Sequence, residues 1–297
     1  MPAVSIIGVG NMGGGMATNL LSRGYTVYAH DVDSSKTAVY QQKGAVVQVS
    51  IAQAAIKSIV TIICVVDALQ THGLLFGAQN IAQHLPAGHT VMLCPTMSPD
   101  DVERCAAKLA EYGVQMMDAP MSGGPARAAN GTMSLMVACT HDLFQRHLKL
   151  LNDLSSKVFH ISERPGDGAR TKLVNNLLSG INLVGAVEVM VLAKRMGLDL
   201  GITLNVIEQS SGQSWIGSDR MHRALATDYE PRAHMGLLAK DTALALAAAQ
   251  SLCPAGQSYP SPLGQAAATV FGQAMQSSCA PLDDSALFEF LQTTPPA

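Results

Sequence analysis

A lysine and two asparagines in the run "GDGARTKLVNN", residues 166–176, are the side chains most suited to proton transfer. On a helix, Lys172 and Asn176 share one face at a spacing of four, and Asn175 lies beside them. An amine there can take or return a hydroxyl proton while the amides hold the hydroxyl oxygen. The pattern predicts acid/base chemistry on a small hydroxyacid. Its alternative is a surface lysine with solvent-facing asparagines, which spacing alone does not exclude.

The glycine-rich stretch "VSIIGVGNMGGGM", residues 4–16, predicts a dinucleotide site. Gly8, Gly10 and Gly13 form a G-x-G-x-x-G match between an apolar strand and a helix, the context that this fingerprint requires. Gly8 would allow the tight turn, Gly10 the approach of backbone to pyrophosphate, and Gly13 close packing of helix on strand. The alternative is a glycine turn in some other βαβ protein.

An acidic residue, Asp31, ends the next predicted strand, close to the spacing of about 20 residues that the fingerprint expects. Its carboxylate can accept hydrogen bonds from ribose hydroxyls and would repel a 2′-phosphate. Val32 follows, so no arginine is available to neutralise such a phosphate. These two residues favour NAD over NADP.

A second glycine-rich loop, "DAPMSGG" at residues 118–124, follows another predicted strand. Ligands bind at this end of the strands in α/β sheets. A hydroxyl group on Ser122 and the bare backbone of Gly123 and Gly124 would suit a substrate carboxylate. The alternative is that the glycines serve turn geometry alone.

The elements that must position these residues fall into two classes along the chain. Through about residue 160, short apolar runs alternate with helical stretches, which predicts an α/β fold with a doubly wound parallel sheet and right-handed crossovers. The expected strands are "AVSIIGVG", "YTVYAHD", "IVTIICVV", "TVMLC", "VQMMDAP", "TMSLMVAC" and "KVFHI". Beyond the turn-rich hinge at 163–168 the expected elements are all helical, over 169–196, 200–211, 218–226, 237–251 and 264–275. Gly197 is expected to cap the first of these helices. The predicted domains are residues 1–163 and 164–297.

Composition narrows the classes of partner. The chain has 297 residues, a formal net charge of −3 and no basic block, so nucleic acid and acidic membrane surfaces are unexpected partners. Only 14% of residues are charged and 48% are hydrophobic, which favours a homo-oligomer. The six cysteines show no zinc spacing, so we expect no metal, no disulfide and a cytoplasmic location. No signal peptide is recognisable, and charges interrupt the apolar segments at 177–192 and 237–249, so no membrane span is expected.

Four ordered motifs together resemble the β-hydroxyacid dehydrogenase family. They are GVGNMG at 8–13, DAPMSGG at 118–124, G-x-G-x-x-x-K-x-x-N-N at 166–176 and K-D at 240–241. That family includes 3-hydroxyisobutyrate dehydrogenase and tartronate semialdehyde reductase and is related to 6-phosphogluconate dehydrogenase. The resemblance covers nearly the whole chain. It implies a Rossmann-type NAD-binding domain, a long interdomain helix and an all-α C-terminal domain that contributes to dimers or tetramers.

The resemblance also implies roles for individual residues. Lys172 would be the catalytic general acid/base. The substrate would be held by Ser122, Gly123, Gly124, Asn175, Asn176 and Lys240. The cofactor would be held by Gly8, Gly10, Asn11, Met12, Gly13, Asp31, Val65, Val66, Thr96, Lys240 and Asp241. The chain departs from many members at Leu93 and Pro95, and the extra Gly14 and Gly15, unfavourable in a helix, have no explanation from the sequence.

The C-terminal segments indicate the class of substrate. The segments 210–221 and 226–241 are most similar to the family branch that oxidises L-threonate, a four-carbon sugar acid. Trp215 could face the extra hydroxyls of such a substrate, or it could be an interdomain packing residue. Alternatives are 3-hydroxyisobutyrate and tartronate or succinic semialdehyde. An imine reductase or a non-catalytic cofactor-binding protein is a further alternative, which the presence of Lys172 disfavours.

Overall fold

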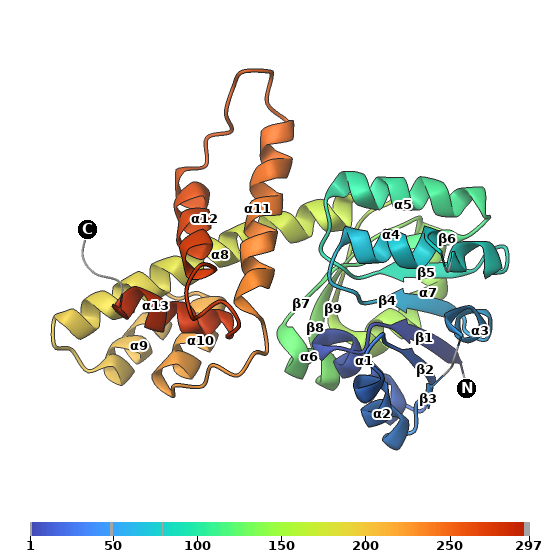
Figure 1. Ribbon diagram of the computed structural model, residues 1–297, viewed down its shortest axis with the longest axis horizontal. Coiled ribbons are helices and arrows are strands. Elements are labelled where there is room, and N and C mark those ends of the chain that lie inside the picture. Colours follow the sequence, from blue (N-terminus) through green and yellow to red (C-terminus); the bar gives the residue numbers. More distant parts are fainter. Residues whose placement is uncertain (1, 48–49, 79, 294–297) are drawn as a thin grey trace. The chain divides into compact units, whose positions relative to one another are not determined.

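The computed structural model describes residues 2–47, 50–78 and 80–293, which form two compact units. The N-terminal unit is Met1–Lys172 and the C-terminal unit is Leu173–Ala297. The N-terminal unit contains a nine-stranded sheet with helices on both faces, and the C-terminal unit is helical (Figure 1).

The strands of the N-terminal unit include every one that the apolar runs predict. They are β1 (Ala3–Ile7), β2 (Thr26–His30), β3 (Val46–Val47), β4 (Val60–Ile63), β5 (Thr90–Leu93), β6 (Gln115–Asp118), β7 (Met121–Ser122), β8 (Met133–Ala138) and β9 (Ser155–Ser162). The two-residue strands β3 and β7 were not predicted, because two residues are too few to show a pattern.

The sheet order is β3-β2-β1-β4-β5-β6-β8-β7, with β9 paired to β8. Strands β1 to β6 are parallel, as expected of a doubly wound sheet. The predicted doubly wound parallel sheet is confirmed, and one edge adds antiparallel pairs that were not predicted, since β8 is antiparallel to both β6 and β7. Only the short α6 joins β7 to β8, and antiparallel strands tolerate such short connections.

The helices and 3₁₀ turns of this unit connect successive strands. They are α1 (Asn11–Ser22), α2 (Ser34–Gln42), α3 (Ile51–Ile56), α4 (Ala68–Phe76), η1 (Ile81–His84), α5 (Pro99–Glu111), α6 (Gly124–Asn130) and α7 (His141–Leu154). Figure 1 shows α4 and α5 on one face of the sheet and α1 and α6 on the other.

Alternate residues of the central strands enter two separate cores. Ile6 and Ile62 pack with α1, α6 and α7, whereas their neighbours Ile7 and Ile63 pack with α3, α4 and α5. All four are at most 3% exposed. Burial on both faces explains why these strands are apolar throughout.

Helix α8 (Asp167–Arg195) leaves the N-terminal unit and continues through the C-terminal one. It begins inside the predicted hinge at 163–168 and is followed by Gly197 at φ +74°, the left-handed conformation expected of a capping glycine. Among the described residues it is the one helix long and apolar enough to cross a membrane, which is weak support for a span because a core helix passes the same test. Leu183, Val187 and Met190 are fully buried in the core of the C-terminal unit.

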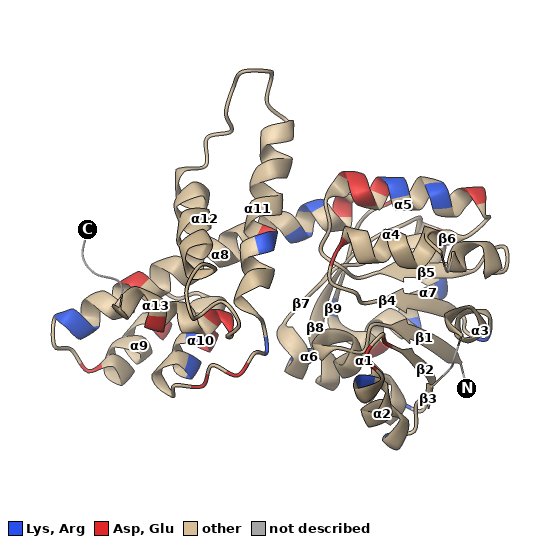
Figure 2. Cartoon of the chain, viewed as in Figure 1, with Lys and Arg blue, Asp and Glu red and all other residues tan. Residues whose placement is uncertain are grey.

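The remaining helices pack against this long helix to form that core. They are α9 (Leu200–Glu208), α10 (Trp215–Leu225), α11 (Met235–Ser251), α12 (Pro262–Ala274), η2 (Asp284–Ala286) and α13 (Leu287–Thr293). Each predicted helical segment corresponds to one of α8 to α12, with ends shifted by up to about three residues. Helix α12 contains no charged residue (Figure 2).

Candidate active site

The carboxyl ends of the parallel strands gather the predicted residues of the N-terminal unit. Parallel strands end at one edge of a sheet, which is where α/β proteins bind ligands. Residues 8–13 follow β1, Asp31 follows β2, Val65 and Val66 follow β4, Thr96 follows β5, and Ser122, Gly123 and Gly124 lie just beyond β6. Segments far apart in the sequence therefore share this edge.

The turn from β1 into α1 needs glycine at two of its fingerprint positions. Gly8 has φ +90°, and a Cβ there would lie 2.5 Å from the carbonyl oxygen of Cys64. A Cβ on Gly13 would lie 1.9 Å from the carbonyl oxygen of Gly8. Gly10 differs, because no described residue other than its chain neighbours has an atom within 4 Å of its Cβ position. Its backbone, at the N-terminus of α1, is therefore open to a phosphate, which suits the N-terminus of a helix. Asn11 and Met12 form the first turn of α1.

Asp31 is held directly beside this glycine turn. Its Oδ2 accepts a 2.9 Å hydrogen bond from the Val9 amide, and its Oδ1 accepts a 3.0 Å bond from the Asp33 amide. Each carboxylate oxygen has a second lone pair, so the group retains capacity for two further donors such as ribose hydroxyls. Val32 is fully exposed and offers no positive charge.

The two glycines without an explanation from the sequence, Gly14 and Gly15, make close helix contacts. A Cβ on Gly14 would lie 1.8 Å from the hydroxyl oxygen of Tyr40 in α2. A Cβ on Gly15 would lie 2.8 Å from Ala128 Cβ and 3.0 Å from the Pro125 carbonyl oxygen, both in α6. Three successive glycines of α1 therefore allow close packing. Gly13 lies against the β1–α1 turn, Gly14 against α2 and Gly15 against α6.

The loop after β7 also needs its glycines for conformation. Gly123 has φ +129° and Gly124 has φ +77°, both in the region that disfavours side chains. A Cβ on Gly123 would additionally meet Arg127 Cδ at 2.8 Å, whereas no atom lies near that position of Gly124. Turn geometry thus accounts for both glycines. The space beside Gly124, two residues after Ser122, is also open to a ligand.

Asp118, at the end of β6, is a buried carboxylate to which the sequence analysis assigned no role. It is 1% exposed, and its Oδ2 accepts 3.0 Å hydrogen bonds from the amides of Gly166 and Ala169. Burial raises the pKa of Asp118 to about 6, although hydrogen bonds from the backbone of residues 166, 168 and 169 act in the opposite direction. The signal in the sequence is an acidic residue that ends an apolar strand.

Lys172 and Asn176 are buried on one face of α8. Their exposed fractions are 7% and 8%, so the alternative of a surface lysine with solvent-facing partners is wrong for this pair. Asn175 is exposed, which agrees with the alternative of a solvent-facing asparagine at that position. Its Nδ2 donates a 3.0 Å hydrogen bond to Asn176 Oδ1. A lysine and an amide are thus buried together one helical turn apart.

In the C-terminal unit, Asp241 of α11 connects two of the predicted residues. Asn176 Nδ2 donates a 2.6 Å hydrogen bond to Asp241 Oδ2, and Lys240 Nζ lies 2.8 Å from Asp241 Oδ1. A carboxylate only accepts, so it fixes which end of the Asn176 amide is the nitrogen. The second hydrogen on that nitrogen is left for another acceptor.

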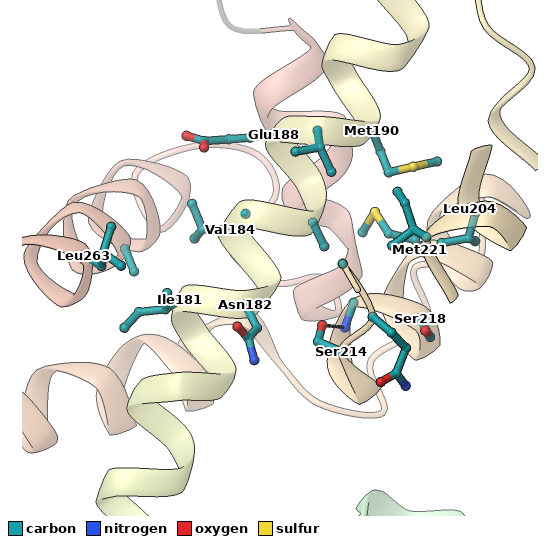
Figure 3. A pocket seen from close by; sticks show the side chains of 18 of the residues that line it. Ile181, Asn182, Val184, Glu188, Met190, Leu204, Ser214, Ser218, Met221 and Leu263 are labelled. Carbon is teal, nitrogen blue, oxygen red and sulfur yellow. Dashed lines mark hydrogen bonds between the residues drawn. The ribbon is translucent and has the colours of Figure 1, made fainter. Parts of the chain in front are cut away.

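Trp215 begins α10 and is 45% exposed, which makes it a surface residue within this structure. Its neighbours Gln213 and Ser214 line a cavity of about 700 Å³ between α8, α9, α10 and α12 (Figure 3). The other lining side chains are mostly apolar, among them Val184, Met190, Leu204, Met221 and Leu263. Lys172 and Asn176 are not among its lining residues.

All six cysteines are free thiols. Among the described residues, no three or more His, Cys, Asp or Glu side chains gather in a way that could hold a metal ion.

Comparison with known proteins agrees with this arrangement. Residues 3–162 match the NAD-binding domain of 6-phosphogluconate dehydrogenase, and residues 166–291 match the NAD-binding domain of NADP-dependent 3-hydroxyisobutyrate dehydrogenase. The chain is 33% identical over 287 residues to an L-threonate dehydrogenase of Escherichia coli O6:H1, an alignment that covers 96% of this chain and 93% of the relative. It is 30% identical to an NAD-dependent L-serine dehydrogenase of Pseudomonas aeruginosa, with 99% of each chain covered.

A solved structure is similar over the full length. It is a 3-hydroxyisobutyrate dehydrogenase from Salmonella typhimurium with a TM-score of 0.89 and 32% identity, covering 98% of this chain and 100% of that one. The domain matches, the identities and the shared fold point to one family and one class of reaction. The chain belongs to the β-hydroxyacid dehydrogenase family and is an NAD(P)-dependent oxidoreductase that acts on CH–OH groups.

Proposed function

We propose that this enzyme oxidises a four-carbon sugar acid such as L-threonate with NAD, using Lys172 as the general acid/base. The observation that carries the mechanism is the burial of Lys172 and Asn176 one turn apart on α8, with the Asn176 amide oriented by Asp241. The substrate is supported by the 33% identity to L-threonate dehydrogenases. The reverse reduction uses the same groups with proton movement reversed.

In the proposed oxidation, Lys172 Nζ accepts the proton of the substrate hydroxyl. Asn176 donates its remaining amide hydrogen to the hydroxyl oxygen, which keeps that oxygen oriented toward the lysine. Ser122 and the backbone of Gly123 and Gly124 bind the substrate carboxylate. Burial of the lysine excludes competing water from the proton that is transferred.

The residues at the carboxyl edge of the sheet fit a dinucleotide. The open backbone at Gly10 and the N-terminus of α1 would take the pyrophosphate, and Asp31 the ribose hydroxyls. Val65, Val66, Thr96, Lys240 and Asp241 complete the proposed set of cofactor contacts. When bound, the nicotinamide ring supplies a hydride acceptor for the substrate carbon.

NAD is the proposed cofactor because Asp31 is both fixed and charged. Two backbone amides hold its carboxylate, so it cannot easily turn away from a 2′-phosphate on NADP. No cation follows it, since Val32 is the next residue. The family that residues 166–291 match is named for an NADP-dependent enzyme. The assays below therefore measure activity with NAD and with NADP.

Reduced-cofactor formation from a panel of hydroxyacids tests the substrate. The panel holds L-threonate, D-threonate, 3-hydroxyisobutyrate, L-serine, glycerate as the product of tartronate semialdehyde reduction, and 4-hydroxybutyrate, each with NAD and with NADP. We expect the highest kcat/KM with L-threonate and NAD. A higher kcat/KM with 3-hydroxyisobutyrate or L-serine contradicts the proposed substrate while preserving the class of reaction. In a separate assay of reduced-cofactor oxidation, turnover of cyclic imines by a protein that oxidises no panel hydroxyacid would favour the imine reductase alternative.

We also propose that the protein is a homodimer or homotetramer in the cytoplasm. Large apolar side chains are exposed on α8 and α9, among them Leu178, Val189, Leu192, Ile202 and Val206. Exposed apolar surface of this kind is typical of an interface between subunits. Light scattering after size exclusion should give a mass of two or four chains. A monomer at micromolar concentration contradicts this proposal.

A further inference from the structure

Asp118 lies at the junction between the sheet and the helix that carries Lys172. Its Oδ2 accepts 3.0 Å hydrogen bonds from the amides of Gly166 and Ala169, and the amide of Gly168 also bonds to its carboxylate. These donors belong to the first turn of α8 and the residue just before it. One buried carboxylate thus satisfies several amides that a helix N-terminus leaves without partners.

The backbone around these amides is shaped to that carboxylate. Gly166 has φ +90°, a left-handed conformation that favours glycine, and its amide donates to Asp118. A Cβ on Gly168 would lie 2.9 Å from Asp118 Cγ and 2.7 Å from the Met136 carbonyl oxygen. The G-x-G spacing before the lysine therefore permits close contact between the start of α8 and the end of β6.

Helix stability alone does not explain a carboxylate here. Asp167, in the first turn of α8, already supplies a negative charge and forms ion pairs with Arg164 and Arg170. It is partly exposed, and these partners hold its pKa below the usual range despite opposing desolvation. Among the described residues, no cation is a main cause of the pKa shift of Asp118, and burial raises this pKa to about 6. A neutral residue would avoid that desolvation.

We propose that Asp118 is a positioning residue for Lys172. It fixes the first turn of α8 to the end of β6, and Ala169, whose amide it binds, lies three residues before the lysine. Residues three apart share a helix face, so a shift of this turn moves the lysine with it. Displacement of a catalytic group by about 1 Å can reduce the rate about 10²-fold. This inference rests on the proposed function, because it requires proton transfer at Lys172.

The test compares Asp118→Asn with Asp167→Asn, which removes the same charge from the same helix end. L-Threonate is the probe, or the panel hydroxyacid with the highest kcat/KM. We expect Asp118→Asn to lower kcat about 10- to 100-fold while the KM for NAD changes less than about 3-fold. Asp167→Asn should leave kcat within about 3-fold of the wild type. Amide hydrogen exchange at residues 166–172 should quicken in Asp118→Asn.

Gly168→Ala provides a second route, because it keeps the carboxylate and introduces a Cβ against it. We expect the same fall in kcat with the KM for NAD preserved. A kcat of Asp118→Asn within 3-fold of the wild type overturns the inference. The inference is also overturned if the loss of activity in Asp118→Asn is fully accounted for by a smaller folded fraction measured by circular dichroism, because Asp118 would then have a purely structural role. Normal turnover in Lys172→Ala instead contradicts the proposed function, whatever the Asp118 variants do.

Discussion

The side-chain nitrogen of Asn176 in α8 lies 2.6 Å from Asp241 Oδ2 in α11, although the two residues are 65 positions apart in the sequence. Asn175 donates to the oxygen of the same amide, so both ends of the Asn176 side chain have a defined partner. The amide is therefore oriented before substrate arrives. Such preorganisation avoids part of the entropic cost of assembling the reacting groups.

A double-mutant cycle tests whether Asp241 acts through Asn176. We expect Asp241→Ala and Asn176→Ala each to lower kcat/KM about 10- to 100-fold, the size of a lost charge-assisted hydrogen bond. The double variant should be little worse than either single variant, because both changes remove the same oriented amide. Thr242→Val is the control, since Thr242 is buried beside Asp241 and its Oγ1 finds no hydrogen-bond partner in the described part of the chain. If the loss of kcat/KM in the double variant equals the product of the two single losses, Asp241 acts independently of Asn176. The same conclusion holds if Asp241→Ala raises only the KM for NAD.

Replacement of Lys172 distinguishes proton transfer from positive charge. Lys172→Ala should lower kcat at least about 10²-fold while NAD binding is largely retained. Lys172→Arg should be impaired to a similar degree, because a guanidinium keeps the charge and cannot deprotonate near neutral pH. Steady-state kinetics and NAD titration by fluorescence provide the two measurements. Near-normal turnover of either variant is incompatible with the acid/base assignment.

Asp31 should control the choice of cofactor. Asp31→Ala removes the proposed ribose acceptor, so the Kd for NAD should rise about 10-fold and that for NADP much less. Asp33→Ala is a matched control, because Asp33 lies two residues away and caps α2 through the Ser35 amide. It should lower the free energy of unfolding through loss of this helix cap and leave the NAD to NADP preference unchanged. A wild-type enzyme that prefers NADP would refute this interpretation of Asp31 and Val32.

Gly15 should resist substitution although alanine is the better helix former. A Cβ on Gly15 overlaps Ala128 Cβ and approaches the α6 backbone at Pro125 and Ala129, so Gly15→Ala must separate α1 from α6. We expect a loss of about 1–3 kcal/mol in the free energy of unfolding. Gly73→Ala in α4, where no atom lies within 4 Å of the new Cβ, should instead gain up to about 1 kcal/mol. Urea denaturation measures both, and equal responses would contradict the packing argument.

The raised pKa of Asp118 predicts a specific dependence of stability on pH. Its pKa is about 6 in the folded protein against a reference value of 3.8, so the folded state binds the proton more tightly. Its contribution to stability therefore falls as pH rises from about 4 through 6 and is nearly constant above about pH 7. Asp118→Asn lacks this titration, so its stability relative to the wild type should improve by about 2 kcal/mol between pH 4 and pH 7. A constant difference would show that the carboxyl group does not titrate in this range.

Much of the architecture could be predicted because it depends on short-range patterns. Apolar runs that fill both faces of a sheet specified each strand of four or more residues, and periodic apolar residues specified α8 to α12. The glycine fingerprint, Asp31 and Lys172 stood at spacings that elementary stereochemistry connects with a dinucleotide and a proton acceptor. The antiparallel edge at β8 was missed, because the direction of a strand leaves no mark in its own residues.

Only the tertiary structure showed what the remaining residues contact. Gly14 and Gly15 became explicable once Tyr40 and Ala128 were found against α1, and Asp118 once the start of α8 was found on its carboxylate. The sequence by itself determined which groups could react and which elements would carry them, because helix and strand periods are local. The burial of Lys172, the orientation of Asn176 by Asp241 and the capping of α8 depend on segments dozens of residues apart, and only packing brings such segments together.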